Sequence, residues 1–183
     1  MVSTQYNELK NRLSSTKVNI MFLPGTSQDE LIEIISILDQ LIELINKQKT
    51  LTTLIEFRQY YLSRANAKQF LKKYLEAEQD YEKVKSLVMS YEADNEWHYL
   101  KALEGIAWNK ARRGNYSEAL FDSNELIAHA YKIDALLGKF FLIRGACYKE
   151  LGQMTLALRS FRLAETNPFL LQNILSTEGD EAL

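Results

Sequence analysis

Residues 140–168 constrain the fold more than any other stretch, because they read as two helices joined by a tight turn. Phe141, Gly145 and Tyr148 follow one another at steps of four and three, which places them on one face of a helix. Gly152 can take the positive φ that commonly ends a helix. The apolar stripe of the second helix consists of Leu156, Ala157, Phe161 and Ala164. Because glycine inside a helix costs about 0.5–1 kcal/mol relative to alanine, Gly145 predicts close packing of the second helix, with Ala157 facing it.

This stretch resembles a tetratricopeptide repeat, whose pattern combines an aromatic residue, a glycine, a tyrosine, an Ala-x3-Phe pair and a proline. The matching residues are Phe141, Gly145, Tyr148, Ala157, Phe161 and Pro168. Two positions depart from the pattern, since Arg144 stands where the family prefers leucine and Pro168 comes one residue early. The resemblance implies antiparallel helix pairs that stack on one another.

Two earlier segments repeat the pattern more weakly. Residues 114–120 resemble the same turn and helix start, with Ala119 aligned on Ala157, and residues 74–81 align through Ala77. The anchors are 42 and 38 residues apart, whereas the family's period is about 34 residues. The resemblance therefore covers roughly residues 55–168, with lengthened helices or loops and an irregular groove.

The chain is therefore predicted to be all-α, a tetratricopeptide-like α-α superhelix of about three helix pairs with extra N-terminal helices and a C-terminal capping helix. Residues 1–26 are expected to hold a helix and an apolar segment, 27–176 the helical domain, and 177–183 a disordered acidic tail. The expected repeat-like units are 53–90, 95–131 and 134–166, followed by the capping helix 168–176.

The predicted helix at 28–47 is apolar on more than one side. Ser27 and Glu30 form a capping-box pattern at its start. Its apolar stripe is widened by Ile32, Ile37 and Leu44. Such a helix either packs between two neighbours or uses its second side to form a dimer.

The segments on either side of this helix leave two questions open. Residues 18–23 are apolar, and they either tuck against the helices, lie in the groove or dock on a second copy. Thr53 and Glu56 form another capping-box pattern, which favours a new helix there. No Gly or Pro lies in residues 48–52, so a continuous helix is the alternative.

Composition excludes several classes of protein. The formal net charge of −2 and the pI of about 5.8 argue against a general nucleic-acid binder, which usually carries a basic footprint. No apolar run approaches the ~20 residues that a membrane helix needs, so no membrane insertion is expected. The first residues lack a signal sequence, and a cytoplasmic location is therefore expected.

The sequence shows no catalytic or metal-binding signature. His98 and His129 are isolated, and Cys147 lies on the apolar side of its helix, where it is expected to pack in the core. No phosphate-binding glycine loop is present. The chain is therefore expected to be no enzyme and to need no cofactor or metal.

In tetratricopeptide-repeat proteins the first helix of each pair lines a concave face that binds a peptide or a partner helix. The resemblance assigns this partner-binding role to Leu62, Asn66, Gln69, Phe70, Lys101, Glu104, Trp108, Arg112, Lys139, Leu142 and Lys149. Trp108 is either a binding hot spot or a packing residue between repeats. Only Asn66 and Lys139 match the family's clamp for a C-terminal carboxylate, so an extended peptide or amphipathic helix fits better.

The function expected from the sequence is non-catalytic protein–protein interaction, as an adaptor or a partner-specific chaperone. One alternative is a self-associating structural protein that forms a homodimer through helix 28–47. A further alternative is a secretion-type tetratricopeptide chaperone, which this chain resembles in layout only. The partner is expected to be a protein or peptide.

Overall fold

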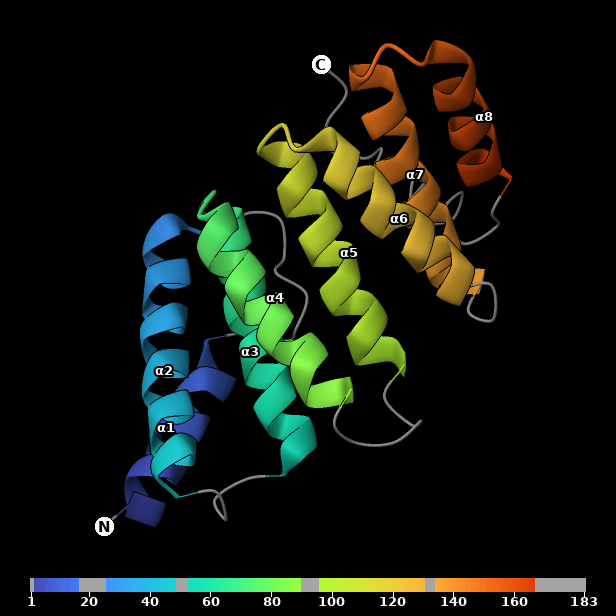
Figure 1. Cartoon of the computed structure of the whole chain (residues 1–183). Coiled ribbons are helices and arrows are strands. Elements are labelled where there is room, and N and C mark those ends of the chain that lie inside the picture. The colour runs from blue at the N-terminus through green and yellow to red at the C-terminus, as the bar shows by residue number, and fades with distance from the viewer. Residues whose placement is uncertain (1, 17–25, 49–52, 90–95, 131–133, 167–183) are drawn as a thin grey trace. The chain divides into compact units, whose positions relative to one another are not determined.

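The computed structural model describes residues 2–16, 26–48, 53–89, 96–130 and 134–166 (Figure 1). All regular secondary structure in these ranges is helical, which confirms the predicted all-α class. The helices are α1 (Val2–Ser15), α2 (Gln28–Lys47), α3 (Leu54–Phe70), α4 (Tyr74–Met89), α5 (Glu96–Arg112), α6 (Tyr116–Ala130), α7 (Asp134–Glu150) and α8 (Met154–Glu165). The apolar segment 18–23, the expected capping helix 168–176 and the acidic tail 177–183 lie outside the described residues.

The chain divides into two compact units, Met1–Gly105 and Ile106–Leu183. Helix α5 crosses the division, so its first turns belong to the first unit and its last turns to the second. In the first unit α2 packs against α1 and α3, and α3 packs against α4. In the second unit α7 packs against α6 and α8. Consecutive helices are thus packed against each other within each unit.

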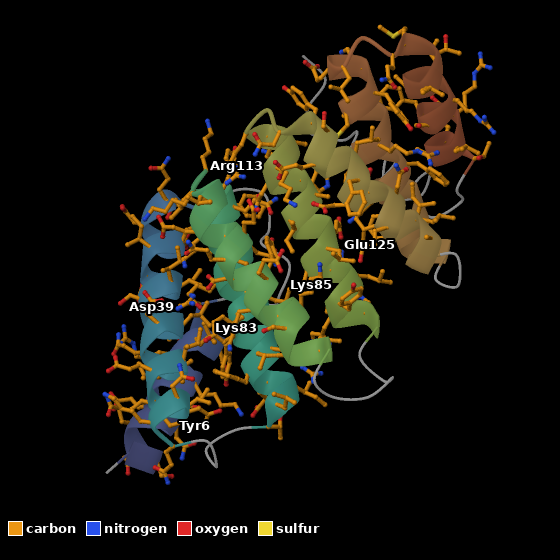
Figure 2. All side chains as sticks on the ribbon, in the orientation of Figure 1. Tyr6, Asp39, Lys83, Lys85, Arg113 and Glu125 are labelled. Carbon is orange, nitrogen blue, oxygen red and sulfur yellow. The ribbon has the colours of Figure 1, made fainter. Side chains whose placement is uncertain are left out.

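The apolar width of α2 is explained by its two neighbours. Ile37 and Leu44, which extend the apolar surface beyond one stripe, are both buried, and Ile32 is exposed. Helix α1 is also linked to α3, because the hydroxyl of Tyr6 (labelled in Figure 2) lies 3.1 Å from that of Tyr60. The interpretation of α2 as a helix packed between two others therefore accounts for its sequence.

Helix caps show that α2 and α3 are separate helices. The predicted capping box is confirmed: Glu30 N donates to Ser27 Oγ at 3.2 Å, and Ser27 N donates to the Glu30 carboxylate at 2.8 Å. Helix α2 ends at Lys47, with Gln48 as its C-cap. Helix α3 begins after Thr53, whose Oγ1 accepts from Glu56 N at 3.2 Å.

A buried carboxylate links three helices of the first unit. Asp80 of α4 accepts from Arg64 of α3 through Nε at 2.9 Å and Nη2 at 2.5 Å, and from Lys68 Nζ at 2.9 Å. The same Arg64 donates through Nη1 to Asp39 of α2 at 2.6 Å. This network had not been predicted. Its signal is a carboxylate inside the apolar stripe of α4, between the buried residues Ala77 and Val84.

Glycine allows helices to approach closely in both units. A Cβ atom on Gly105 of α5 would overlap the ring of Tyr81 in α4. A Cβ atom on Gly145 of α7 would lie 2.5 Å from Cε1 of Phe161 in α8. The close packing predicted at Gly145 is therefore present, and the group that occupies the space is the Phe161 ring.

The glycines in the turns agree with the sequence prediction, whereas the buried face of α8 differs from it. Gly114 and Gly152 have φ values of +84° and +74°, as expected for glycines that end a helix. The prediction that Leu156 points inward is wrong, because its side chain is exposed. The face of α8 that is buried consists of Ala157, Ser160 and Ala164, and Leu156 is about 100° around the helix from Ala157.

Candidate functional site

In the first unit, several of the predicted binding residues gather around the hydroxyl of Tyr81. This hydroxyl lies 2.6 Å from Asn66 Oδ1 and 3.0 Å from Gln69 Oε1, both on α3. The Tyr81 ring is itself buried on α4 against Gly105. A buried tyrosine hydroxyl therefore fixes the orientation of two partly exposed carboxamides.

Helix α5 adds a charged pair beside this hydroxyl. Lys101 Nζ lies 2.8 Å from the Glu104 carboxylate, three residues further along the helix. Burial raises the pKa of Tyr81, and the negative charges of Glu104 and then Asp80 raise it further. Because the hydroxyl keeps its proton at neutral pH, it remains a hydrogen-bond donor to the carboxamides.

Two aromatic side chains on the same helices extend the surface formed by these polar groups. Phe70 follows Gln69 at the end of α3 and is 59% exposed. Trp97 lies one turn before Lys101 on α5, and the Lys101 ammonium is 6.0 Å from the centroid of its indole ring. We refer to Asn66, Gln69, Phe70, Trp97, Lys101 and Glu104 as the Tyr81 patch.

The structure places Leu62 in the core. The resemblance assigns this residue to the same partner-binding face, but its side chain is only 3% exposed. Helix α3 packs between α2 and α4, and this burial on two sides covers Leu62. Leu62 is therefore no part of the Tyr81 patch.

In the second unit, the predicted residues form two smaller groups. On α5 the guanidinium of Arg112 lies 5.8 Å from the centroid of the half-buried Trp108 ring. On α7 the half-buried Lys139 and Leu142 and the exposed Lys149 lie at steps of three and seven, which places them on one face.

Arg144, which departs from the repeat pattern, has a structural role in α7. Its Nε donates to Ser160 Oγ of α8 at 3.1 Å, and its guanidinium lies 4.8 Å from the centroid of the Phe141 ring. Burial lowers its pKa. A leucine at this position would lose the hydrogen bond that joins α7 to α8.

The described residues contain no cluster of metal-ligating side chains. Among them, no group of three His, Cys, Asp or Glu side chains could hold a metal ion. His98 stacks edge-on against Trp97 with centroids 5.1 Å apart, and burial, followed by the charge of Arg58, lowers its pKa. In the same ranges, no helix has the length and apolar character that crossing a membrane requires.

We expect Cys147 to react slowly with thiol reagents in the native protein. Its side chain is fully buried in α7, and burial raises the pKa of the thiol to about 11. Because the thiolate is the reactive form, the rate of reaction with Ellman's reagent at pH 8 should be at least roughly 100-fold lower than in guanidinium-unfolded protein. Equal rates in the folded and unfolded states would contradict this burial.

Fold and site together define an all-α protein whose partly exposed polar and aromatic side chains are held on packed helix pairs. No protein-family model matches the chain, and no curated protein sequence matches it. Tyr81, which organises that site, is not among the binding residues predicted from the sequence. The signal that could have found it is the pair of carboxamides at 66 and 69, one turn apart on one helix face.

Proposed function

We propose that the chain is a non-catalytic protein-binding module with a tetratricopeptide-like arrangement of helices, acting as an adaptor or a partner-specific chaperone. The observation that carries this proposal is the Tyr81 patch. There, two oriented carboxamides and an ion pair lie beside exposed aromatic rings. Aromatic side chains such as these are enriched at protein–protein interfaces.

The carboxamides favour contact with a polypeptide backbone. When the amide oxygens of Asn66 and Gln69 accept from Tyr81, their NH₂ groups stay available as donors. Peptide carbonyl groups are strong acceptors with two lone pairs each. An extended partner segment could therefore bind through its main chain.

The aromatic side chains supply the apolar part of the interaction. Phe70 is a large, exposed ring at the end of α3. Tryptophan and arginine are the residue types most enriched at binding hot spots, which favours the Trp108–Arg112 pair of the second unit as a further contact. The α7 residues Lys139, Leu142 and Lys149 add a mixed apolar and basic face.

The two alternative functions are supported to different degrees. A secretion-type chaperone is a special case of the proposed function and would use the same surfaces. Self-association through α2 is less favoured, because Ile37 and Leu44, two of the three apolar residues that suggested it, are buried, and only Ile32 is exposed.

Selection of binding peptides provides the test. The full chain is immobilised, and ligands are selected from a displayed library of random 15-residue peptides. We expect the Phe70→Ser variant to bind the selected peptides at least 10-fold more weakly than the native chain, because a central aromatic contact is lost.

Ile55→Ser is a matched control. Ile55 lies on the same helix and is 58% exposed, against 59% for Phe70, but it is about 22 Å away along α3. Circular dichroism should show that both variants keep the native helix content. Equal loss of binding in the two variants, or none in either, would remove the Tyr81 patch as the binding surface.

A further inference from the structure

Helix α6 carries an exposed phenylalanine. Phe121 is 71% exposed, the largest value for a large apolar side chain in the described ranges. Ala119 and Leu126 of the same helix are buried, and the helical repeat places them on the other side of it. The Phe121 ring therefore projects away from the packed face of α6.

The helix surface around this ring is acidic. Glu118 and Glu125 lie three residues before and four residues after Phe121, which makes them its neighbours on the helix surface. The side chain of Glu118 is 64% exposed, and its contact with Lys110 of α5 is long, at 3.9 Å. Helix α6 contains no Lys or Arg. We call Phe121, Glu118 and Glu125 the α6 knob.

Helix α8, in the same unit, carries a hollow of the opposite charge. The hollow has a volume of about 480 Å³ and lies opposite the face of α8 that is buried. Leu158 and Leu163, which are 53% and 38% exposed, supply its apolar part. We call it the α8 hollow, and its lining consists of Thr155, Leu158, Arg159, Arg162, Leu163 and Thr166.

Two arginines make this hollow basic. Neither Arg159 nor Arg162 forms an ion pair in the part of the chain that the structure describes. Glu165, the one acidic residue of α8, does not belong to the lining. The hollow therefore favours a ligand that is apolar at its centre and acidic at its edge, which is the composition of the α6 knob.

We propose that the protein self-associates by inserting the α6 knob of one copy into the α8 hollow of another. The Phe121 ring contacts Leu158 and Leu163, and the carboxylates beside it pair with the two arginines. A cavity of about 150 Å³ is enough for a benzene ring, so the hollow has room for a phenyl ring and for charged groups next to it.

The contact has a defined symmetry and strength. Because knob and hollow lie on different helices, the interface is heterologous, and each copy offers one knob and one hollow. Complementary charge favours this pairing over knob against knob or hollow against hollow. Interfaces below about 1,200 Å² are typical of weak, transient complexes, so a contact centred on one ring should form only at high protein concentration.

Sedimentation velocity on the full chain tests the proposal, over about 0.01–1 mM protein, the range that weak association requires. The sedimentation coefficient of the native chain should rise with concentration. Phe121→Ser, which lacks the knob, and the Leu158→Ser, Leu163→Ser double variant, which lacks the hollow, should each stay monomeric. An equimolar mixture of the two should associate again, because one variant keeps the hollow and the other keeps the knob.

A charge swap tests the ionic part of the contact. Arg159→Glu with Arg162→Glu should abolish association. Adding Glu118→Arg should restore part of it, because the two charges then have opposite signs again.

The control separates this surface from the proposed peptide-binding site. Phe70→Ser removes an aromatic side chain that is 59% exposed in the other unit, and it should associate like the native chain. Conversely, Phe121→Ser should bind the selected peptides as the native chain does. Circular dichroism should show native helix content in every variant.

Three results would overturn the proposal. The first is a native chain that stays monomeric over the whole concentration range. The second is association that Phe121→Ser leaves unchanged, and the third is a mixture of the two monomeric variants that does not associate.

Discussion

Replacing Asp80 with alanine is expected to lower the free energy of unfolding by about 3 kcal/mol, since removing one partner of a buried ion pair leaves the other charge uncompensated. Asp80 is 4% exposed and accepts hydrogen bonds from Arg64 and Lys68. Both cations are themselves largely buried, and Lys68 would lose its carboxylate. Arg64 would keep Asp39, which places the expected loss at the low end of the usual range. Urea unfolding followed by circular dichroism measures the change.

Asp39→Ala is the matched control for this variant. Asp39 also pairs with Arg64, at 2.6 Å, but its carboxylate is exposed on α2. Exposed ion pairs contribute about 0–1 kcal/mol, so the loss should be several-fold smaller than for Asp80→Ala. Equal losses for the two variants would mean that burial of Asp80 does not determine its contribution.

Gly105→Ala is expected to destabilise the protein by about 1–3 kcal/mol, the usual cost of adding a methyl group to a filled core. In an isolated helix the same change would stabilise by about 0.5–1 kcal/mol, so the expected sign is opposite to that of helix propensity. The added Cβ atom would overlap the Tyr81 ring. Tyr81 is buried and hydrogen-bonded to Asn66 and Gln69, and it therefore cannot swing away without breaking these bonds.

A double variant separates this overlap from other effects. Tyr81→Leu removes the ring, so Gly105→Ala should destabilise the Tyr81→Leu protein much less than the native protein in a double-mutant cycle. Gly145→Ala should cost less than Gly105→Ala, because the Phe161 ring that it meets is only half-buried and has room to move. An increase in stability for Gly105→Ala in the native background would rule out the close contact.

The features that could be predicted from the sequence are those that neighbouring residues determine. The Ser27–Glu30 capping box depends on two side chains three residues apart, and both of its hydrogen bonds are present. The positive φ of Gly152 depends on that residue alone. The helical class follows from apolar spacing.

The candidate site was predicted only in part. The repeat resemblance assigned Asn66, Gln69, Lys101 and Glu104 to a common face, and the structure brings them around the Tyr81 hydroxyl. It also assigned Leu62 to that face, where the side chain proves to be buried. Periodicity places a residue on one side of a helix, but it does not show how many other helices cover that side.

The helices, their caps and the glycines that end them can therefore be predicted from the sequence, because hydrogen bonds and backbone angles within a few residues control these features. Helix packing, in contrast, decided that Asp80 meets two cations from α3 and that Phe161 fills the space at Gly145. It also decided that Tyr81 orients the candidate site. These contacts join residues 12 to 16 positions apart, and their geometry depends on how whole helices pack.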